Sequence, residues 1–420
     1  MHRTSVRRAL RIVTVLLRHT VLAVVAMACR RALTTPARAA LHLRLALEEL
    51  GPMFMKLGQV LSTRPDLVPP AYETELAKLQ DAAPPVPVAE VEATVRRALG
   101  QAVGDAYATF DQVPLAAASI GQVHAATLPD GTDVVVKVRR PGVVDQIDLD
   151  LHLLARAAGL LARLPFLRRY DPAGLVREFA ATLRGELDYE REGHNAERVG
   201  AELAAEPRVH VPGVHWEATT EDVLTEDRIR GTKIDDVAAL DAAGLDRPGV
   251  AARFADAYLT MVFVHGFFHA DPHPGNVFVE PDGRIGFVDF GMVGTVAPEA
   301  SRGLGVVLFA LVGGDATRMA DALLRLGIAG DEVARASLEG DLAVLLARYT
   351  DRPLAELHLG PLLGDVMGVV RRHHLRLPSD LALLLKTVMM CEGVAAQLDP
   401  SFELVPRLLP YAARLAGDTT

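Results

Sequence analysis

The order of apolar and polar positions divides the first third of the 420-residue chain into two kinds of element. An apolar stripe at helical spacing predicts a helix over residues 38–60, and the same spacing resumes over 88–99 after the proline-rich stretch PPVPV. From about residue 111 the pattern changes to short strand-like runs. Two of these, QVHAATL at 122–128 and TDVVVKV at 132–138, flank a Pro-Asp-Gly turn and predict a β-hairpin.

The rest of the chain is mainly helical in pattern. Helical spacing covers residues 145–205 and returns after residue 246. Prolines break the helical pattern at Pro165 and at 170–172. Three strand-like stretches interrupt it further, at 208–218, 222–230 and 267–296. A small β-containing lobe followed by a mainly helical lobe predicts an α+β fold with two lobes.

Positive charge gathers at the N-terminus. Nine arginines and no carboxylate precede Glu48, although the whole chain carries a net charge of −9. The apolar run TVLAVVAMAC at 20–29 is too short to cross roughly 30 Å of hydrocarbon as a helix, and extending it back to Ile12 would include Arg18 and His19. It fits a basic, apolar helix on an anionic membrane surface or an ordinary packing helix with exposed arginines. A signal peptide, cleaved after small residues, conflicts with the cytoplasmic nucleotide that the motifs below need.

Composition narrows the class of protein. Hydrophobic residues make up 50% of the chain with charge of both signs, as expected for a globular protein. The acidic balance gives no whole-chain reason to bind nucleic acid. Two cysteines, Cys29 and Cys391, are too few for a disulfide framework, which favours a reducing, cytoplasmic compartment.

One segment carries most of the candidate chemistry. The stretch FFHADPHPGNVFVEPDGRIGFVDFGMVG at 267–294 contains His269 and Asp271, with Asn276 five residues after the aspartate. A Pro-Asp-Gly hairpin then leads to Asp289, which opens an Asp-Phe-Gly triplet. This order is typical of the catalytic loop and metal-binding triplet of enzymes that transfer phosphoryl groups. Protein kinases and small-molecule phosphotransferases share it, so the segment alone does not separate them.

The spacing suits phosphoryl transfer for a physical reason. A hairpin between Asn276 and Asp289 brings an amide oxygen and a carboxylate to neighbouring strand ends, and Mg²⁺ prefers such ligands. Asp271, on the loop, can then orient an attacking hydroxyl group or water. His269 and His273 leave a transition-metal site open as an alternative, although we expect both to pack against or shape the loop.

A lysine and a small-residue loop lie upstream. Lys137 stands in the strand-like VVVKV, and LAAASIGQ at 115–122 precedes it, as a glycine loop precedes the phosphate-contacting lysine of kinases. The candidate nucleotide-loop residues are Ala116, Ala117, Ala118, Ser119 and Gly121. The alternatives are a solvated strand charge and an ordinary strand entry.

Lys137 needs an acidic partner, and GELDYEREGHN at 185–195 offers several. Glu186 and Glu190 would share one helical face, as would Asp188 and Glu192. This is more acid than one ion pair requires, so a solvated acidic face stays an alternative.

The stretch MFMKLGQVLSTRPDLVP places Lys56, Gly58 and Gln59 inside the first predicted helix. Glycine in a helix costs about 1 kcal/mol relative to alanine, so Gly58 suggests that another backbone comes close, with simple tolerance of the glycine as the alternative. A second polar cluster ends the next helix and consists of Lys78, Gln80 and Asp81.

Together these motifs resemble the UbiB/ABC1 family of atypical, protein-kinase-like proteins. They occur in family order over about residues 45–300, and the helical end CEGVAAQLDPSFEL extends the likeness to about 405. The motifs are KLGQ at 56–59, LQDAAPPVP at 79–87, PLAAASIGQVHAA at 114–126, VVVKVRRPG at 134–142, ELDYERE at 186–192, FFHADPHPGN at 267–276 and FVDFG at 287–291.

The resemblance implies a role for each matched position. Lys137 would hold nucleotide phosphates and pair with Glu192, and Asp271 would be the catalytic aspartate. Asn276 and Asp289 would hold the metal. The alanine loop and Glu226, in the strand expected at 222–230, would bind the nucleotide. The resemblance also implies a regulatory cluster. Its acidic pair would be Glu186 and Asp188, and the helix lying over the active site would contact that pair through the segment with Lys56, Gly58 and Gln59.

The family further implies a two-lobe kinase-like fold, ATP and Mg²⁺ as cofactors, and ATPase activity in support of isoprenoid quinone biosynthesis or membrane-lipid homeostasis. Expected partners are an anionic membrane surface or prenyl-lipid intermediate and quinone-biosynthesis proteins, with the chain cytoplasmic at the inner face of the membrane. A spanning N-terminal helix, a true phosphotransferase and a nucleotide-gated scaffold stay open as alternatives.

The expected segments are an arm at 1–37, a helical extension at 38–105, an N-lobe at 106–230 with a helical insertion at 145–180, and a C-lobe at 231–420. After Asp399 the chain LVPRLLPYAARLAG is too short to span a membrane.

Overall fold

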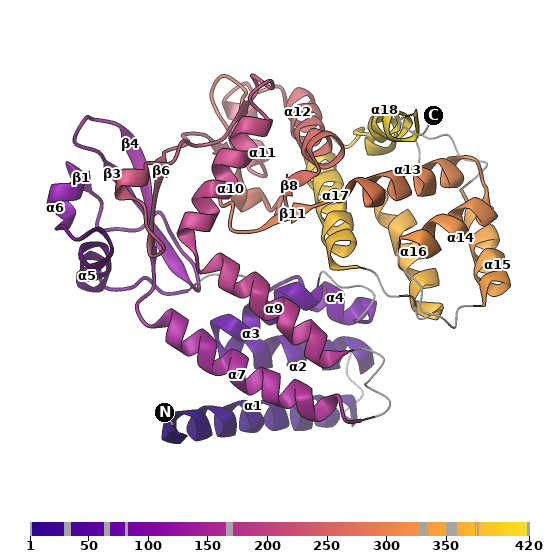
Figure 1. Ribbon diagram of the computed structural model, residues 1–420, viewed down its shortest axis with the longest axis horizontal. Helices are drawn as coiled ribbons and strands as arrows, with labels where there is room; N and C mark the ends of the chain where they lie inside the picture. The colour runs from indigo at the N-terminus through magenta and orange to yellow at the C-terminus, as the bar shows by residue number, and fades with distance from the viewer. Residues whose placement is uncertain are drawn as a thin grey trace. The chain divides into compact units, whose positions relative to one another are not determined.

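The computed structural model (Figure 1) describes residues 2–28, 35–62, 68–79, 83–164, 171–326, 334–349, 359–373, 375 and 378–417. The chain divides into two compact units, of which the first comprises Met1–His194 and Gly213–Arg228. The second comprises Asn195–Pro212 and Ile229–Thr420. Helix α10 (Tyr189–Glu202) begins in the first unit and ends in the second.

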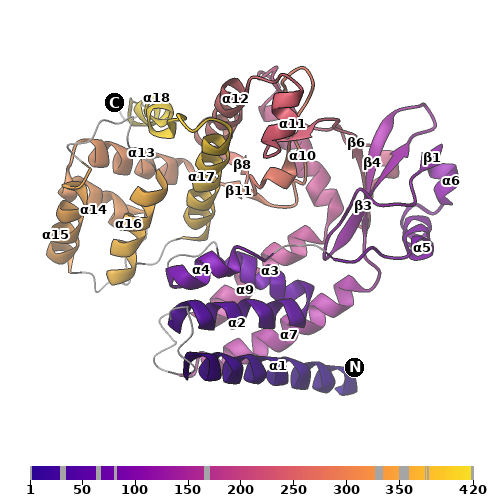
Figure 2. The same cartoon turned by 180° about the vertical axis from the view of Figure 1, so that it is seen from behind.

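A layer of helices forms one part of the first unit. It contains α1 (His2–Ala28), α2 (Thr35–Leu50), α3 (Pro52–Ser62), α4 (Pro70–Leu76), α7 (Val143–Leu161) and α9 (Pro172–Glu186). Helix α1 lies along α2 and α7, as both views of the molecule show (Figures 1 and 2). Leu50, Phe54, Ile147 and Leu183 belong to the apolar core that these helices share.

An antiparallel sheet forms the other part of the first unit. Its strands are β1 (Thr109–Phe110), β2 (Ala116–Ala117), β3 (Gly121–Thr127), β4 (Asp133–Arg139) and β6 (Val223–Asp227), in the order β1-β3-β4-β6 with β2 beside β3. Helix α5 (Val88–Leu99) packs on β4 and β6, next to the short α6 (Val103–Ala106) and a 3₁₀ turn at Trp216–Ala218. Val134, Val136 and Val138 of β4 are buried in the core shared with α5, so Lys137 points to the opposite face of the sheet.

The second unit holds two small sheets among helices. One sheet has the order β5 (Val209–His210), β10 (Ile285–Phe287), β9 (Val277–Val279), β7 (Thr232–Lys233), and the other pairs β8 (Phe267–His269) with β11 (Val293–Thr295). Its helices are α11 (Val237–Ala242), α12 (Arg247–Thr260), α13 (Pro298–Val312), α14 (Ala316–Arg325), α15 (Arg335–Leu346), α16 (Leu359–Arg372), α17 (Ser379–Leu398) and α18 (Leu404–Gly417), with a π-helical turn at Met261–His265 and a 3₁₀ turn at Pro274–Asn276.

Helix α17 needs comment because of its composition. Within the described residues it is the one helix long and apolar enough to cross a membrane, with a mean hydropathy of 1.5. Core helices of soluble proteins meet the same criteria. Here α17 packs on α12 and α16 and buries Leu384, Thr387 and Cys391. Burial raises the pKa of the Cys391 thiol far above its ordinary value. These contacts are those of a core helix.

The predicted mixed α+β fold is confirmed, and so is the hairpin of β3 and β4. The prediction of a single helix over 38–60 was wrong. Gly51 has φ +98°, and this residue in the left-handed region separates α2 from α3. The strand-like run at 208–218 forms two residues of strand, β5, which lies parallel to β10. Within the helical stretch 145–205, α7 ends at Leu161 and α9 begins after Asp171. The expected apolar run at 20–29 is the end of α1, and Cys29 lies outside the described residues.

Candidate active site

Lys137 and Glu192 form a close ion pair in the first unit. The Lys137 Nζ atom lies 2.8 Å from both carboxylate oxygens of Glu192, in the first turn of α10. The two side chains are 17% and 3% exposed, and the ammonium also lies 5.2 Å from the centre of the Tyr189 ring. Of the four acids considered as partners of Lys137, Glu192 thus forms a close pair with it, while Glu190 is exposed.

The alanine loop has an ordinary strand conformation. Ala116 and Ala117 form β2 and pair with Val123 and Gln122 of β3. The amide of Ala118 donates a hydrogen bond to the carbonyl oxygen of Gly121 at 2.8 Å. All three alanines have negative φ, so the loop does not use the backbone conformations for which glycine is needed.

Arg140 bonds this loop, and Tyr189 lies against it. Arg140 Nε donates to the carbonyl oxygen of Ala118 at 2.7 Å, and its Nη2 donates to that of Pro84 at 2.7 Å. A Cβ atom on Gly121 would collide with the Tyr189 hydroxyl group and lie 2.9 Å from the Val138 carbonyl oxygen. Packing is thus a sufficient reason for glycine at 121, and its contact with nucleotide stays a prediction.

Lys56 and Glu186 join α3 to α9. Lys56 Nζ lies 2.8 Å from Glu186 Oε2, with the side chains 18% and 8% exposed. Gly58 faces the tips of three leucine side chains, two of which, from Leu47 and Leu79, would overlap a Cβ atom there. The close approach inferred at Gly58 is therefore to side chains, and the inference of a neighbouring backbone was wrong.

The other two members of the expected regulatory cluster have local partners. Gln59 Nε2 donates to the carbonyl oxygen of Leu79 at 3.1 Å, and this is a different contact from the one expected with the acidic pair. Asp188 Oδ1 accepts from the amide of Arg191 at 3.1 Å, as a residue that caps the start of α10 does. Lys78 pairs with Glu75 at 2.6 Å, and Gln80 and Asp81 lie outside the described residues.

Glu226 lies on β6, the last strand in the order of the first unit's sheet. It occupies β6 opposite Val135 of β4, and its side chain is buried. The structure thus places Glu226 on a strand next to the one that carries Lys137. Its role in nucleotide binding stays a prediction.

Asp271 and Asn276 meet in the second unit. Asn276 Nδ2 donates to Asp271 Oδ2 at 3.0 Å and lies 3.3 Å from the Asp271 carbonyl oxygen. Because this bond engages the amide nitrogen, the Asn276 amide oxygen is the atom available for a cation. The amide of Val288 donates to the Asn276 carbonyl oxygen at 3.0 Å, which holds the residue before Asp289 beside the loop.

His269 braces the same loop from within the core. Its Nδ1 accepts from the Asp271 amide at 3.2 Å, so its Nε2 carries the proton and donates to the Val288 carbonyl oxygen at 3.1 Å. His269 is fully buried, and Phe290 packs edge-on against its ring. His273 Nδ1 accepts from the Gly275 amide at 3.0 Å and shapes the loop. Both histidines have the packing roles that the sequence favoured.

Asp289 has a backbone conformation that is uncommon for a residue with a side chain. Its φ is +67°, and its side chain is exposed. Aspartate tolerates this left-handed region better than most residues, and such outliers cluster at functional sites. The conformation supports a functional interpretation of the Asp-Phe-Gly triplet.

The donor atoms fit Mg²⁺ in one particular way. Groups of three or more His, Cys, Asp or Glu side chains able to hold a metal are absent from the described part of the chain. Mg²⁺ is usually bound by one or two carboxylates together with substrate phosphates, and it needs no protein cage. The exposed Asp289 carboxylate and the oriented Asn276 amide oxygen match that pattern.

Two neighbouring residues of α17 contact the loop that carries Asp271, and the sequence pattern did not predict either contact. Lys386 Nζ lies 3.9 Å from Asp271 Oδ1, and Thr387 Oγ1 lies 3.2 Å from the Ala270 carbonyl oxygen. One feature of the sequence could have pointed to Lys386: it is the one basic residue in the 20-residue apolar sequence of α17.

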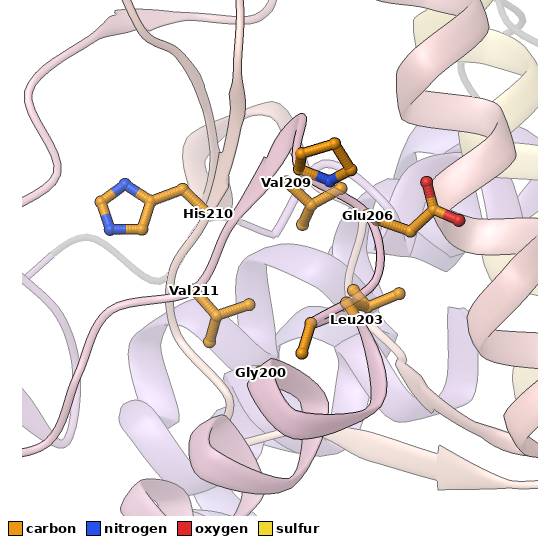
Figure 3. A pocket seen from close by; sticks show the side chains of 8 residues that line it. Gly200, Leu203, Glu206, Val209, His210 and Val211 are labelled. Carbon is orange, nitrogen blue, oxygen red and sulfur yellow. The ribbon is translucent and has the colours of Figure 1, made fainter.

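A cavity of about 210 Å³ also lies in the second unit, between the end of α10 and β5 (Figure 3). Leu203, Val209 and Val211 line it, while the His210 ring pairs with Glu280 at 3.0 Å. None of the candidate site residues lines this cavity, so we do not connect it with the chemistry.

Comparison with known proteins gives the family. Residues 78–323 match the ABC1 atypical kinase-like domain, and residues 342–403 match the UbiB helical domain. The chain is 41% identical over 381 residues to the probable protein kinase UbiB of Xylella fastidiosa, covering 89% of this chain and 69% of that protein. It is 37% identical over 384 residues to the uncharacterized protein sll1770 of Synechocystis, covering 91% and 66%.

A solved structure gives the same result. Rv3197 of Mycobacterium tuberculosis, in complex with erythromycin, matches with a TM-score of 0.62 at 27% identity, covering 90% of this chain and 97% of that one. The fold is thus protein-kinase-like, with additional helices at both ends of the sequence. The chain belongs to the UbiB/ABC1 family of atypical kinase-like proteins.

Proposed function

We propose that this protein is an ATP-binding, Mg²⁺-dependent atypical kinase that acts mainly as an ATPase. The observation that carries the proposal is the linked geometry of Asp271, Asn276 and Asp289, in which the first two are hydrogen-bonded and the third has a positive φ. The Lys137–Glu192 pair supports it, because such a pair orients a strand lysine toward nucleotide phosphates in kinases.

Each residue then has a chemical task. Lys137 binds nucleotide phosphate, with its orientation set by Glu192. Asp271 orients the attacking water and accepts its proton as the bond to the terminal phosphoryl group breaks. Asn276 and Asp289 hold Mg²⁺, which neutralises phosphate charge when bound. Hydrolysis gives ADP and phosphate, and the same arrangement would serve a hydroxyl acceptor in place of water.

The physiological process we propose is isoprenoid quinone biosynthesis or membrane-lipid homeostasis. Family membership and the relatives named UbiB support this assignment. A prenylated lipid or an assembly of quinone-biosynthetic proteins is the proposed partner, at the cytoplasmic face of a membrane.

Helix α1 supplies a surface suited to such a membrane. Five apolar side chains of α1 are each more than half exposed, and they are Leu10, Val13, Leu17, Val21 and Val24. The opposite face is fixed to the protein: Arg8 Nη2 lies 2.6 Å from Asp150 of α7. A docked helix that still presents apolar side chains, with exposed arginines beside them, fits the interface of an anionic lipid surface.

ATP hydrolysis by the purified full-length chain tests the enzymatic part. We expect Mg²⁺-dependent turnover that rises with anionic vesicles, and we expect Asp289→Asn to abolish it. Asp282→Asn is the matched control, because Asp282 is an exposed aspartate on the turn of the same hairpin. Unchanged turnover in Asp289→Asn would refute the proposal.

Two other outcomes would change the assignment. Efficient transfer to a protein or small hydroxyl acceptor by the intact chain would make it a true phosphotransferase. Nucleotide binding without hydrolysis at any lipid composition would make it a scaffold. For the physiological part, cells lacking the gene should lose quinone or accumulate a prenylated precursor, and an unchanged lipid profile would contradict that assignment.

A further inference from the structure

The catalytic loop receives two contacts from outside the kinase-like segment. Lys386 and Thr387 belong to the UbiB helical segment at 342–403, whereas Ala270 and Asp271 belong to the kinase-like segment at 78–323. Thr387 is fully buried, and its Oγ1 lies 3.2 Å from the Ala270 carbonyl oxygen and 2.9 Å from that of Leu383. This fixes the rotation of α17 about its axis and so brings the preceding residue to Asp271.

The surroundings of Asp271 show what Lys386 contributes. Oδ2 of Asp271 accepts from Asn276, and Oδ1 faces Lys386 Nζ at 3.9 Å. In the described part of the chain, Lys386 is the one cation within ion-pair distance of this carboxylate. Tyr258, a buried residue of α12, adds no positive charge there, and burial raises the pKa of its hydroxyl group well above the ordinary value. The carboxylate is therefore held between an amide and an ammonium group.

The distance and exposure of the Lys386–Asp271 pair suit a role in catalysis better than a role in stabilising the fold. Its atoms are farther apart than a hydrogen bond, and the side chains of Lys386 and Asp271 are 25% and 36% exposed. Pairs this accessible contribute little to folding. Near transferring phosphate, however, an unbalanced carboxylate would repel the phosphoryl oxygens, and a positioned cation counters that repulsion.

We propose that Lys386 is a positioning residue of the phosphoryl-transfer site, supplied by the UbiB helical segment. Its ammonium group orients the Asp271 carboxylate and balances its charge during transfer. This inference rests on the proposed function. It means that the helical segment contributes to the chemistry of the kinase-like segment and is more than a support for it.

Three variants at position 386 in the full-length chain test the proposal. Lys386→Met should lower kcat for ATP hydrolysis by about 10- to 100-fold while the nucleotide dissociation constant stays within about twofold. Its Tm should stay within about 2 °C of the wild type, because the pair is partly exposed. Lys386→Arg should recover most of the activity, and added ethylammonium should partly restore Lys386→Ala, since both return a cation. Gln397→Met is the control, because Gln397 is an exposed polar residue of the same helix.

The outcomes separate this inference from the proposed function. Wild-type turnover in Lys386→Met, with Asp289→Asn inactive, would overturn the role of Lys386 alone. A loss of kcat with a lowered Tm and no recovery by arginine or ethylammonium would also overturn it, since the residue would then be structural. Turnover that is absent in the wild type, or unaffected by Asp289→Asn, would overturn both.

Discussion

Lys56 Nζ on α3 lies 2.8 Å from Glu186 Oε2 at the end of α9. The pair is mostly buried and joins a helix near the N-terminus to the acidic stretch that precedes Glu192. We predict that Lys56→Met destabilises the first unit by about 2–4 kcal/mol, because the mostly buried Glu186 carboxylate loses the ammonium group that lies 2.8 Å from it. The free energy of unfolding in urea measures this cost.

The double variant Lys56→Met/Glu186→Gln provides the control for that prediction. It removes both charges, so its cost should be smaller than the sum of the two single variants. Additive costs would show that the two side chains do not stabilise each other.

The backbone at Asp289 supports a second prediction, which separates conformation from chemistry. With φ at +67°, Asp289→Gly should keep or slightly raise the free energy of unfolding, whereas Asp289→Val should lower it by about 1–3 kcal/mol. Both should be inactive, because each lacks the carboxylate. Equal stability of the glycine and valine variants would contradict the strained backbone.

His269 yields a third prediction, because its ring bonds both the Asp271 amide and the carbonyl group of Val288, the residue before Asp289. In His269→Phe the Asp271 amide and the Val288 carbonyl group lose their partner inside the core, which should cost about 2 kcal/mol or more. Turnover should fall as well, since both loops are then less well held. His273→Ala is the comparison: its ring is exposed and bonds one local amide, so the loss of stability should be well under that of His269→Phe.

A fourth prediction concerns the alanine loop. Ala117→Gly and Ala118→Gly should change nucleotide affinity and raise autophosphorylation, because glycine frees a segment that β2 pairing and Arg140 now hold in one shape. Nucleotide titration and labelled phosphate incorporation measure the two effects. Ala108→Gly, at an exposed position outside the loop, serves as the control. If both loop variants match the wild type, the alanines do not determine the activity.

The outer face of α1 gives a fifth prediction. Leu10→Gln/Leu17→Gln should weaken binding to anionic vesicles in a sedimentation assay and leave the Tm nearly unchanged, because both leucines are 61% exposed. Binding by the wild type should weaken at high salt. The matched variant Val113→Gln/Val344→Gln changes two exposed apolar residues away from α1 and should bind normally. Equal binding by the two variants would exclude α1 as the membrane surface.

Local sequence order was enough to propose Asp271, Asn276 and Asp289 as one site, because Asn276 follows Asp271 by five residues and a short hairpin connects Asn276 with Asp289. The pairing of Lys137 with Glu192 spans 55 residues, and the local pattern left several acids open. The family resemblance, not the pattern, singled out Glu192. Which acid pairs with Lys137 depends on where the helix begins. Here α10 begins at Tyr189, and this places Glu192 toward Lys137 of β4.

Other features depend on contacts that a linear pattern does not contain. Lys386 is 115 positions from Asp271, since 386 − 271 = 115, and a single lysine in an apolar helix carries no local mark of its target. Arg8 and Asp150 are separated by 142 residues, and together they decide which face of α1 is turned inward. The break at Gly51 was hidden because apolar spacing continues across it.

The bond between Thr387 and the Ala270 carbonyl group bears on how this protein can associate with a bilayer. Helix α17 has the length and hydropathy of a membrane anchor, yet inserting it would pull Thr387 and Lys386 away from the catalytic loop. If the proposed phosphoryl-transfer site is correct, insertion of α17 into a membrane would therefore take that site apart. Attachment through α1, as we propose, would leave α17 in place, so lipid binding would not compete with phosphoryl transfer.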